Sequence, residues 1–142
     1  MTIFATRYHD ISVGHRVYQH ESKCAHLHGH NYRIHFSVES QQLDEIGRVI
    51  DFSVIKEKLC MWLEDHWDHK FLVWYCDPWG NQLLELDPEG VVLVNFNPTA
   101  ENMAEYLVKE VGPVQLRKTN VVLTKVIIEE TRKCSCTFTL EK

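Results

Sequence analysis

The sequence lacks any apolar run close to the ~20 residues that a membrane-crossing helix needs. Its first residues, MTIFATRYHDISVGH, have neither the continuous apolar core nor the small-residue cleavage site of a signal peptide. Positive charge is not in excess, because the formal net charge is −5, and this argues against a nucleic-acid-binding surface. The five cysteines form no disulfide framework, since their number is odd and their spacing irregular, which is typical of a reducing compartment. We therefore expect a cytoplasmic protein with neither a membrane nor a nucleic acid as its partner.

What is present is ordinary for a globular protein. Hydrophobic residues make up 44% and charged residues 25% of the chain. A chain of 142 residues is long enough to bury roughly 70% of the surface that it exposes when unfolded. We see no internal repeat and no low-complexity tract, so residues 1–142 are expected to form a single domain.

Histidine is the exception, because seven of the nine histidines fall within residues 9–35. His28 and His30 begin a segment, 28–38, whose even positions read His, His, Tyr, Ile, Phe, Val. This alternation predicts a half-buried strand, and on a strand both imidazoles point to the same face and can reach one metal ion. Residues 3–13 also suit a strand, and the following His15 shares the parity of its apolar residues. A hairpin would bring His15 to the other two histidines.

Three imidazoles with an open fourth position suit a catalytic Zn²⁺ better than a structural one. Cys24 lies four residues before His28, close enough to share a pocket without being an evident fourth ligand. The plainer alternative is that His-x-His is a hydrogen-bonded or surface pair. Since zinc takes four ligands, the remaining histidines of the cluster are expected to have surface, packing or supporting roles; they are His9, His20, His26 and His35.

The rest of the chain predicts two helices and two further strands. Asp51 or Ser53 could cap a helix that runs to about Glu64, and a second helix is expected from Pro98-Thr99 to Val111, ended by Gly112-Pro113. Alternating patterns over 122–130 and 134–140 predict a hairpin joined at 131–133. The first of these patterns places Val122, Thr124, Val126, Ile128 and Glu130 on one face. The stretch Val73–Asn95 is interpreted as a long excursion between the helices.

The expected order is ββααββ, an α+β class in which an antiparallel sheet carries two helices on one face. Such a sheet leaves two edges unpaired, and unpaired edges tend to pair with a neighbouring chain. We therefore expect a homo-oligomer.

Six segments in this order and spacing resemble the family of 6-pyruvoyltetrahydropterin and 6-carboxytetrahydropterin synthases. They are SVGH ending at His15, CAHLHGHNY from Cys24, Ile50-Asp51-Phe52, WDHKFL from Trp67, PTAEN from Pro98, and IIEET from Ile127. The resemblance covers nearly the whole chain. It implies the tunnelling fold, in which ββααββ units oligomerise into a β-barrel, usually as a hexamer with active sites between subunits.

The resemblance also implies roles for individual residues. His15, His28 and His30 would be the zinc ligands. Cys24 would act as general base, and Asp68 would orient His69 to complete the proton-transfer group. Glu130 would anchor the pterin by accepting hydrogen bonds from its amino and ring N–H groups. Glu101 would lie near that pocket.

Each role has a plainer alternative. Cys24 could be an inert small residue, Glu130 a solvated strand end, and Glu101 a first-turn acid that the helix dipole favours. Asp65-His66 rivals Asp68-His69, but Leu72 follows the later histidine by three residues, as the family pattern requires.

Three residues separate Cys24 from the His-Gly-His motif, as in the 6-carboxytetrahydropterin synthases of queuosine biosynthesis. The implied reaction converts 7,8-dihydroneopterin triphosphate to 6-carboxy-5,6,7,8-tetrahydropterin, with release of triphosphate and acetaldehyde. The alternatives are a 6-pyruvoyl product, or a non-catalytic zinc-stabilised module that binds a pterin.

Two features depart from the family pattern: Val73 stands where asparagine is common, and the following excursion is long. The triphosphate contacts are not identified by the sequence. The basic residues near the motifs, each with a solvated surface charge as the plainer explanation, are Arg16, Lys23, Arg33 and Lys70.

Overall fold

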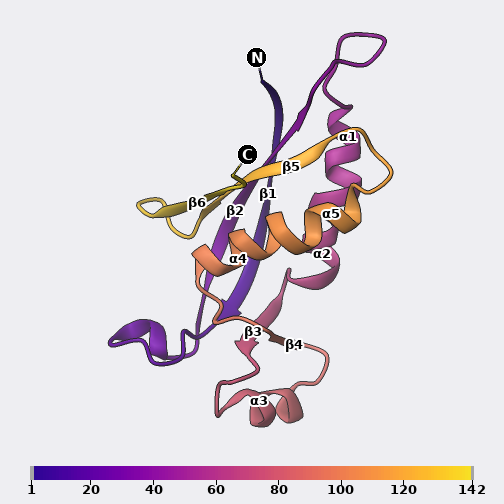
Figure 1. Cartoon of the computed structure of the whole chain (residues 1–142). Coiled ribbons are helices and arrows are strands. Elements are labelled where there is room, and N and C mark those ends of the chain that lie inside the picture. Colours follow the sequence, from indigo (N-terminus) through magenta and orange to yellow (C-terminus); the bar gives the residue numbers. More distant parts are fainter. Residues whose placement is uncertain (1, 142) are drawn as a thin grey trace.

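The computed structural model describes residues 2–141. Its centre is a long, curled sheet of six strands in the order β4-β3-β1-β2-β5-β6 (Figure 1). The strands are β1 (Ile3–His15), β2 (His28–Ser40), β3 (Lys70–Trp74), β4 (Val91–Val94), β5 (Val122–Glu129) and β6 (Ser135–Thr139). The α+β class and all four predicted strands are confirmed.

β1 and β2 form the predicted hairpin, and β2–β5 and β5–β6 are also antiparallel. The expectation of four strands in a wholly antiparallel sheet was wrong. β3, which ends where the excursion Val73–Asn95 begins, and β4, which lies within it, extend the sheet in parallel, and the short helix α3 (Gly80–Leu86) lies between them. The sheet is therefore mixed rather than wholly antiparallel.

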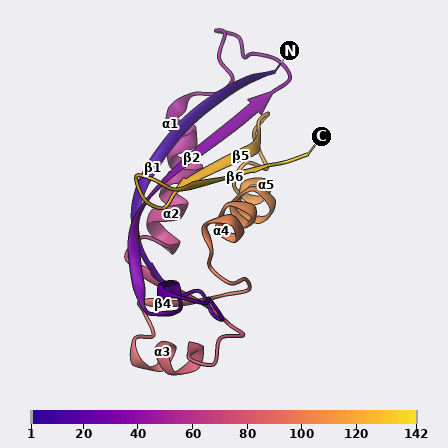
Figure 2. The ribbon, with the colours of Figure 1, turned by 90° about the vertical axis from the view of Figure 1, so that its left-hand side faces the viewer.

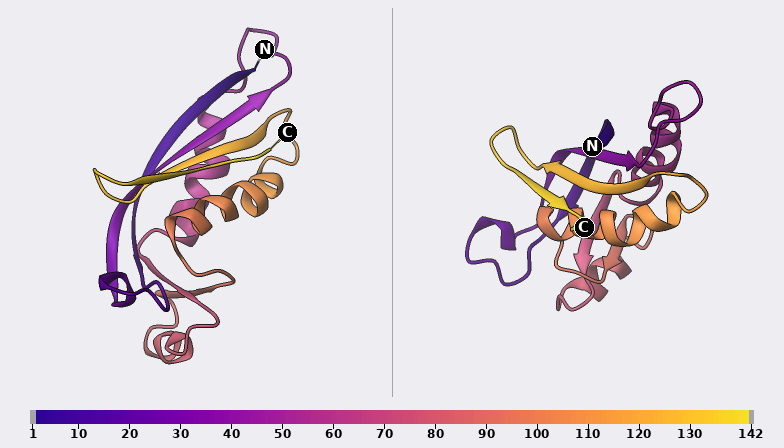
Figure 3. Two further views of the ribbon diagram at one scale, coloured as in Figure 1. Left: turned by 60° about the vertical axis from the view of Figure 1, so that its left-hand side comes forward. Right: turned by 45° about the horizontal axis from the view of Figure 1, so that its top comes forward.

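Two helical segments cover one face of the sheet (Figures 1 and 3). The first joins α1 (Phe52–Ile55), a π-helical stretch (Lys56–Cys60) and α2 (Met61–His66), and its N-terminus is capped by Asp51, which accepts a hydrogen bond from the Ser53 N–H. The second joins α4 (Ala100–Tyr106), a π-helical stretch (Leu107–Val111) and α5 (Gly112–Gln115). Between helices and sheet lie large, fully buried side chains, among them Tyr32, Ile34, Phe36, Leu59, Leu63, Met103 and Leu107. Each contributes about 1.5–3 kcal/mol on burial.

Two details of the prediction were wrong. The second helix does not end at Gly112-Pro113, because the widened π-helical turn pairs the Gly112 N–H with the Leu107 carbonyl and the chain continues to Gln115. Val122 is half exposed rather than on the buried face, because a register shift opposite Ser37 and Val38 reverses the alternation at the start of β5. Thr124, Val126 and Ile128 are buried, as expected.

The long strands of the curved sheet run from one end of the molecule to the other (Figure 2). The β2–α1 loop lies at one end, whereas the β1–β2 connection, residues 16–27, lies at the other end together with α3 and β4 (Figures 1 and 2). Within the described residues, no helix is long and apolar enough to cross a membrane.

Candidate metal centre and active site

The three histidines are brought together by the register of the β1–β2 hairpin. His15 lies opposite His28, and Val13 lies opposite His30. The predicted convergence of the three imidazoles is confirmed, since adjacent strands carry their side chains to the same face at paired positions.

Two glycines allow this end of the hairpin to close. Gly14 and Gly29 are paired on the face opposite to the histidines. A Cβ at Gly29 would lie 2.9 Å from the Val13 carbonyl oxygen, and a Cβ at Gly14 would lie 2.6 Å from the Phe71 ring. Larger residues at these positions would therefore push β1 away from β2 or from β3 and spread the histidines.

The ligand atoms of His15, His28, His30 and Glu130 all lie within 4.8 Å of one another. His15 donates its Nδ1–H to the Pro98 carbonyl at 2.6 Å, and His28 donates its Nδ1–H to the His26 carbonyl at 2.8 Å. These bonds fix both rings and leave their Nε2 atoms as the metal-binding nitrogens.

The Nε2 atoms of His28 and His30 are buried and have no hydrogen-bond partner in the described part of the chain. Glu130 Oε1 is 2.8 Å from His30 Nε2, but the two groups are not aligned as a hydrogen bond. Unpaired buried nitrogens are costly unless something binds them. The donor set of three imidazoles and one carboxylate therefore fits a bound divalent metal.

The electrostatics of His15 and His30 lower the pKa of both and favour the neutral imidazole that binds metals. Burial lowers the pKa of His15 to about 4; the hydrogen bond to Pro98 opposes this shift, and the neighbouring His28 and His30 add to it. Burial also lowers the pKa of His30, although the nearby Glu130 carboxylate opposes this shift.

The metal-free protein should therefore lose stability in acid. Between pH 6.5 and pH 4 the unfolded chain binds a proton at His15 that the folded chain does not, so the free energy of unfolding falls as the pH is lowered. The loss should reach about 3 kcal/mol below pH 4. Denaturant unfolding of the metal-free protein across this range measures it. His15→Gln should flatten the dependence, and an unchanged slope in that variant would contradict the assignment.

Tyr32 belongs to the centre, although the sequence assigned it no role. Its fully buried hydroxyl lies 3.2 Å from His15 Nε2 and 3.3 Å from His15 Nδ1, and its ring packs edge-on against His15 and His30. Burial raises the pKa of Tyr32 far above its usual range, so the hydroxyl stays protonated. Its parity with His28 and His30 in β2 was the signal that could have found it.

Cys24 lies beside the metal centre but outside the group of ligand atoms. It sits in a single 3₁₀ turn, Lys23–Ala25, and is half-buried. Cys24 is close enough to Tyr32 to help raise the pKa of the tyrosine, as do Glu130 and Cys136. The turn that carries Cys24 is therefore near the histidine cluster, and the role of the thiol stays a prediction.

Cys136 of β6 is a second thiol at this site. Burial raises its pKa to about 11, and Glu101 and Glu130 reinforce the shift, so this thiol remains neutral. Glu101 is an exposed residue in the first turn of α4 and lies near β6. Glu101 is not among the four potential ligands, and its place near the pterin pocket stays a prediction.

Asp68 and His69 form the expected pair. His69 donates its Nδ1–H to Asp68 Oδ2 at 2.8 Å, while Asp68 Oδ1 accepts the Ser12 N–H at 2.9 Å. Partial burial raises the pKa of Asp68, but the hydrogen bonds from Ser12 and His69 outweigh it and leave the pKa below its usual range. His69 adopts the left-handed conformation, with φ of 60°, and its side chain is 80% exposed. An exposed, oriented imidazole in a strained backbone is typical of a functional residue.

This pair does not lie with Cys24 and the metal centre in the same chain. Asp68 and His69 line a cavity of about 890 Å³ together with Asp10, Ser12, Asn31 and Arg33. These strand residues have the opposite parity to His15, His28 and His30, so the cavity is on the other face of the sheet. Glu129 and Glu130 also line the cavity, and Glu129 pairs with His35.

The structure also places the other residues that the sequence analysis considered for the site. His66 is exposed and stacks on Trp62, so Asp65-His66 is the end of a helix and not part of either site. Arg16 is buried and paired with Asp77, so it is not free to bind a triphosphate. Arg33 pairs with Asp10 on the rim of the cavity.

The family profile described as 6-pyruvoyl tetrahydropterin synthase matches residues 5–141. A curated protein of Rickettsia conorii named 6-carboxy-5,6,7,8-tetrahydropterin synthase is 32% identical over 133 residues, which cover 93% of this chain and 96% of that protein. A Halobacterium salinarum protein named probable 6-carboxy-5,6,7,8-tetrahydropterin synthase is 38% identical over 98 residues, covering 68% of this chain and 61% of that protein.

Solved structures share the fold. An uncharacterized protein of Wolinella succinogenes superposes with a TM-score of 0.86 at 22% identity, covering 99% of both chains. The 6-pyruvoyl tetrahydropterin synthase of Caenorhabditis elegans superposes with a TM-score of 0.68 at 23% identity, covering 99% of this chain and 97% of that one.

Proposed function

Because the chain belongs to the 6-pyruvoyl tetrahydropterin synthase family, we propose that it is a 6-carboxy-5,6,7,8-tetrahydropterin synthase. The proposed lyase reaction takes 7,8-dihydroneopterin triphosphate and water to 6-carboxy-5,6,7,8-tetrahydropterin, acetaldehyde and triphosphate. The observation that carries the proposal is the cluster of three histidines, in which the buried Nε2 atoms of His28 and His30 have no hydrogen-bond partner among the described residues, with Cys24 in the adjoining turn. The names of the curated relatives that cover 93% of the chain support the choice of product.

Zinc suits the donor set, and His15, His28 and His30 would hold it. When bound, such an ion polarises substrate oxygens and stabilises negative charge that develops when a proton leaves. Glu130 would then turn its carboxylate to the donor edge of the pterin ring, where two near-parallel hydrogen bonds fix the orientation of the substrate.

The chain's own groups move the protons. Cys24, deprotonated to the thiolate, would accept a proton from the substrate side chain. His69 would exchange protons through its exposed Nε2, because its Nδ1–H is committed to Asp68. Ring reduction would be balanced by oxidation of the substrate's own side chain, so the reaction needs no redox cofactor.

The separation of Cys24 from His69 within one chain supports a site shared between copies of the chain. The Ile3–Ile11 part of β1 is paired only to β2 among the described strands, and β6 is the opposite edge of the sheet. Free edges of this kind favour pairing between copies. We therefore propose a homo-oligomer, with the hexamer of the family as the expected form.

Mass spectrometry of the products tests the function. Zinc-loaded protein incubated with 7,8-dihydroneopterin triphosphate should yield 6-carboxytetrahydropterin and acetaldehyde in equal amounts. A 6-pyruvoyl product without acetaldehyde would still support the proposed active site, but it would overturn the proposed product. Unchanged substrate, with the metal and the oligomer verified in the same sample, would contradict the proposed function and favour a binding module.

A further inference from the structure

A buried ion pair lies next to the metal centre and has no part in the function described above. Arg16, the residue after His15, pairs with Asp77 through two contacts, Nε to Oδ2 at 2.5 Å and Nη2 to Oδ1 at 2.8 Å. The side chains are 7% and 0% exposed. Removing two charges from water is costly unless their geometry is good and their other donors are satisfied.

The third nitrogen and the face of the guanidinium also have partners. Arg16 Nη1 donates to the Ala25 carbonyl at 2.9 Å, and the guanidinium lies 3.6 Å from the centre of the Trp79 ring. Asp77 Oδ1 also accepts the Trp79 N–H at 2.9 Å, which fixes the turn that presents both residues. Asp77 and Trp79 come from the excursion between β3 and β4, and Ala25 follows Cys24.

The Cys24 turn has few other supports. Lys23–Ala25 contains no buried residue, and Ser22, the residue before the turn, makes no side-chain capping hydrogen bond. The backbone N–H of Val17 donates to the Cys24 carbonyl at 2.8 Å. Arg16 supplies the contact to the next carbonyl, and it does so from a side chain that is itself fixed on three sides.

We propose that Arg16 is a positioning residue for Cys24, and that the excursion supplies Asp77 and Trp79 as its anchor. The inference rests on the proposed function in one respect, namely that the Cys24 thiol takes part in the reaction. Arg16 holds the Cys24 turn against the end of β1, at the end of the molecule where the excursion and the β1–β2 connection meet (Figures 1 and 2). Small displacements of a reacting group can cost about 10²-fold in rate, so this restraint matters for turnover.

The test is the double variant Arg16→Met/Asp77→Asn. It removes both charges together, so neither is left buried and unpaired, and the asparagine oxygen can still accept the Trp79 N–H. We expect kcat to fall about 10–100-fold with KM changed less than about threefold. Hydrogen–deuterium exchange of residues 20–27 should accelerate, while metal content stays at the wild-type value.

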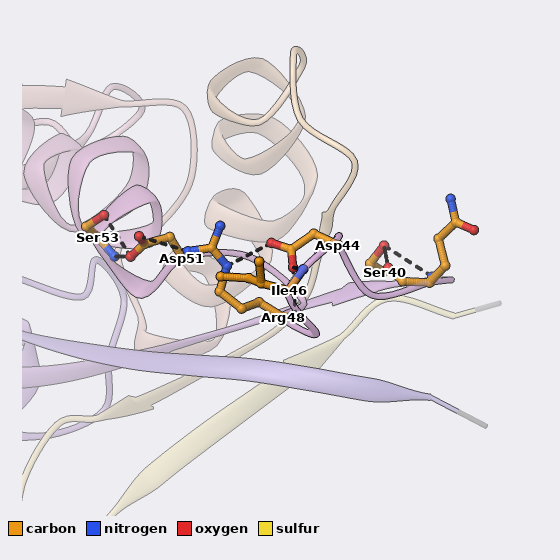
Figure 4. A network of polar contacts seen from close by, with 7 residues as sticks. Ser40, Asp44, Ile46, Arg48, Asp51 and Ser53 are labelled. Atoms are coloured by element: carbon orange, nitrogen blue, oxygen red, sulfur yellow. Dashed lines mark hydrogen bonds and ion pairs between the residues drawn. The ribbon is translucent and has the colours of Figure 1, made fainter.

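The matched control is Arg48→Met/Asp44→Asn, the same chemical exchange at the far end of the molecule. Arg48 Nε donates to Asp44 Oδ2 at 2.8 Å, and Asp44 Oδ1 accepts the N–H groups of Ile46 and Arg48 in the exposed β2–α1 loop (Figure 4). This variant should leave kcat and the exchange of residues 20–27 unchanged.

Unchanged exchange at 20–27 in the Arg16 double variant would overturn the proposal, as would a kcat within about twofold of wild type. Should that variant fail to fold, Arg16→Lys replaces it, because one ammonium group cannot hold Asp77 at two points and also reach Ala25. Faster exchange at 20–27 is again expected, and wild-type exchange and kcat would overturn the proposal. If the wild-type protein turns over no pterin, the proposed function fails, and the exchange measurement still decides whether Arg16 fixes the turn.

Discussion

Replacing Cys24 by alanine should lower kcat by about 10²–10⁴-fold while the protein keeps its metal and its oligomeric state. The thiol is half-buried in a short turn and lies outside the group of potential metal ligands, so its removal takes away a proton acceptor and little else. Steady-state kinetics with 7,8-dihydroneopterin triphosphate, together with metal analysis of the purified variant, measure both parts of the expectation.

Two further variants sharpen this result. Cys24→Ser keeps the size of the side chain but not its acidity, and should be nearly as inactive as the alanine variant. His28→Ala should behave differently, because it removes a candidate metal ligand. The His28 ring is fixed by its hydrogen bond to the His26 carbonyl, and its buried Nε2 has no hydrogen-bond partner among the described residues. The variant should lose metal and activity together. Full turnover by Cys24→Ala would refute the role as base, and loss of metal from it would make Cys24 a ligand.

The convergence of the three histidines could be predicted from the sequence, because strand periodicity fixes the face on which each imidazole lies. A period of two places His28 and His30 on one face, and the same parity in the preceding strand adds His15. The hairpin register, which pairs His15 with His28, then brings the three imidazoles together. Such a pattern predicts the folded arrangement reliably, because turning either strand over would expose its apolar residues to solvent.

Features that depend on pairing between distant segments could not be predicted in the same way. β3 and β4 are mostly apolar strands of five and four residues, too short to be distinguished from a loop by periodicity, and they join the sheet in parallel. The ion pair between Arg16 and Asp77 spans 61 positions in the chain. No local signal marks Arg16 as buried, since arginine is usually exposed.

The face of the sheet on which Asp68 and His69 lie also depends on such pairing, and it decides whether one chain can form the site alone. The sequence joins them to Cys24 through the family pattern, but β3 meets β1 only at Val13–His15, and the turn before it delivers the pair to the far face of the sheet. A shared site therefore predicts complementation. Cys24→Ala and His69→Ala should each be nearly inactive alone, yet mixed oligomers of the two should regain activity.

In a random one-to-one mixture, a site built from two copies receives both intact residues in roughly a quarter of cases. Activity should accordingly rise from the residual level of either variant to about a quarter of wild type. The two chains are co-expressed with different affinity tags, and the mixed oligomer is isolated by successive purification on both. Wild type mixed with the double variant Cys24→Ala/His69→Ala serves as the control, because its sites contain the same proportion of intact residues. If the verified mixed oligomer stays at the level of the single variants, Cys24 and His69 do not complete each other's site across copies, and the transfer of protons by His69 would have to be abandoned.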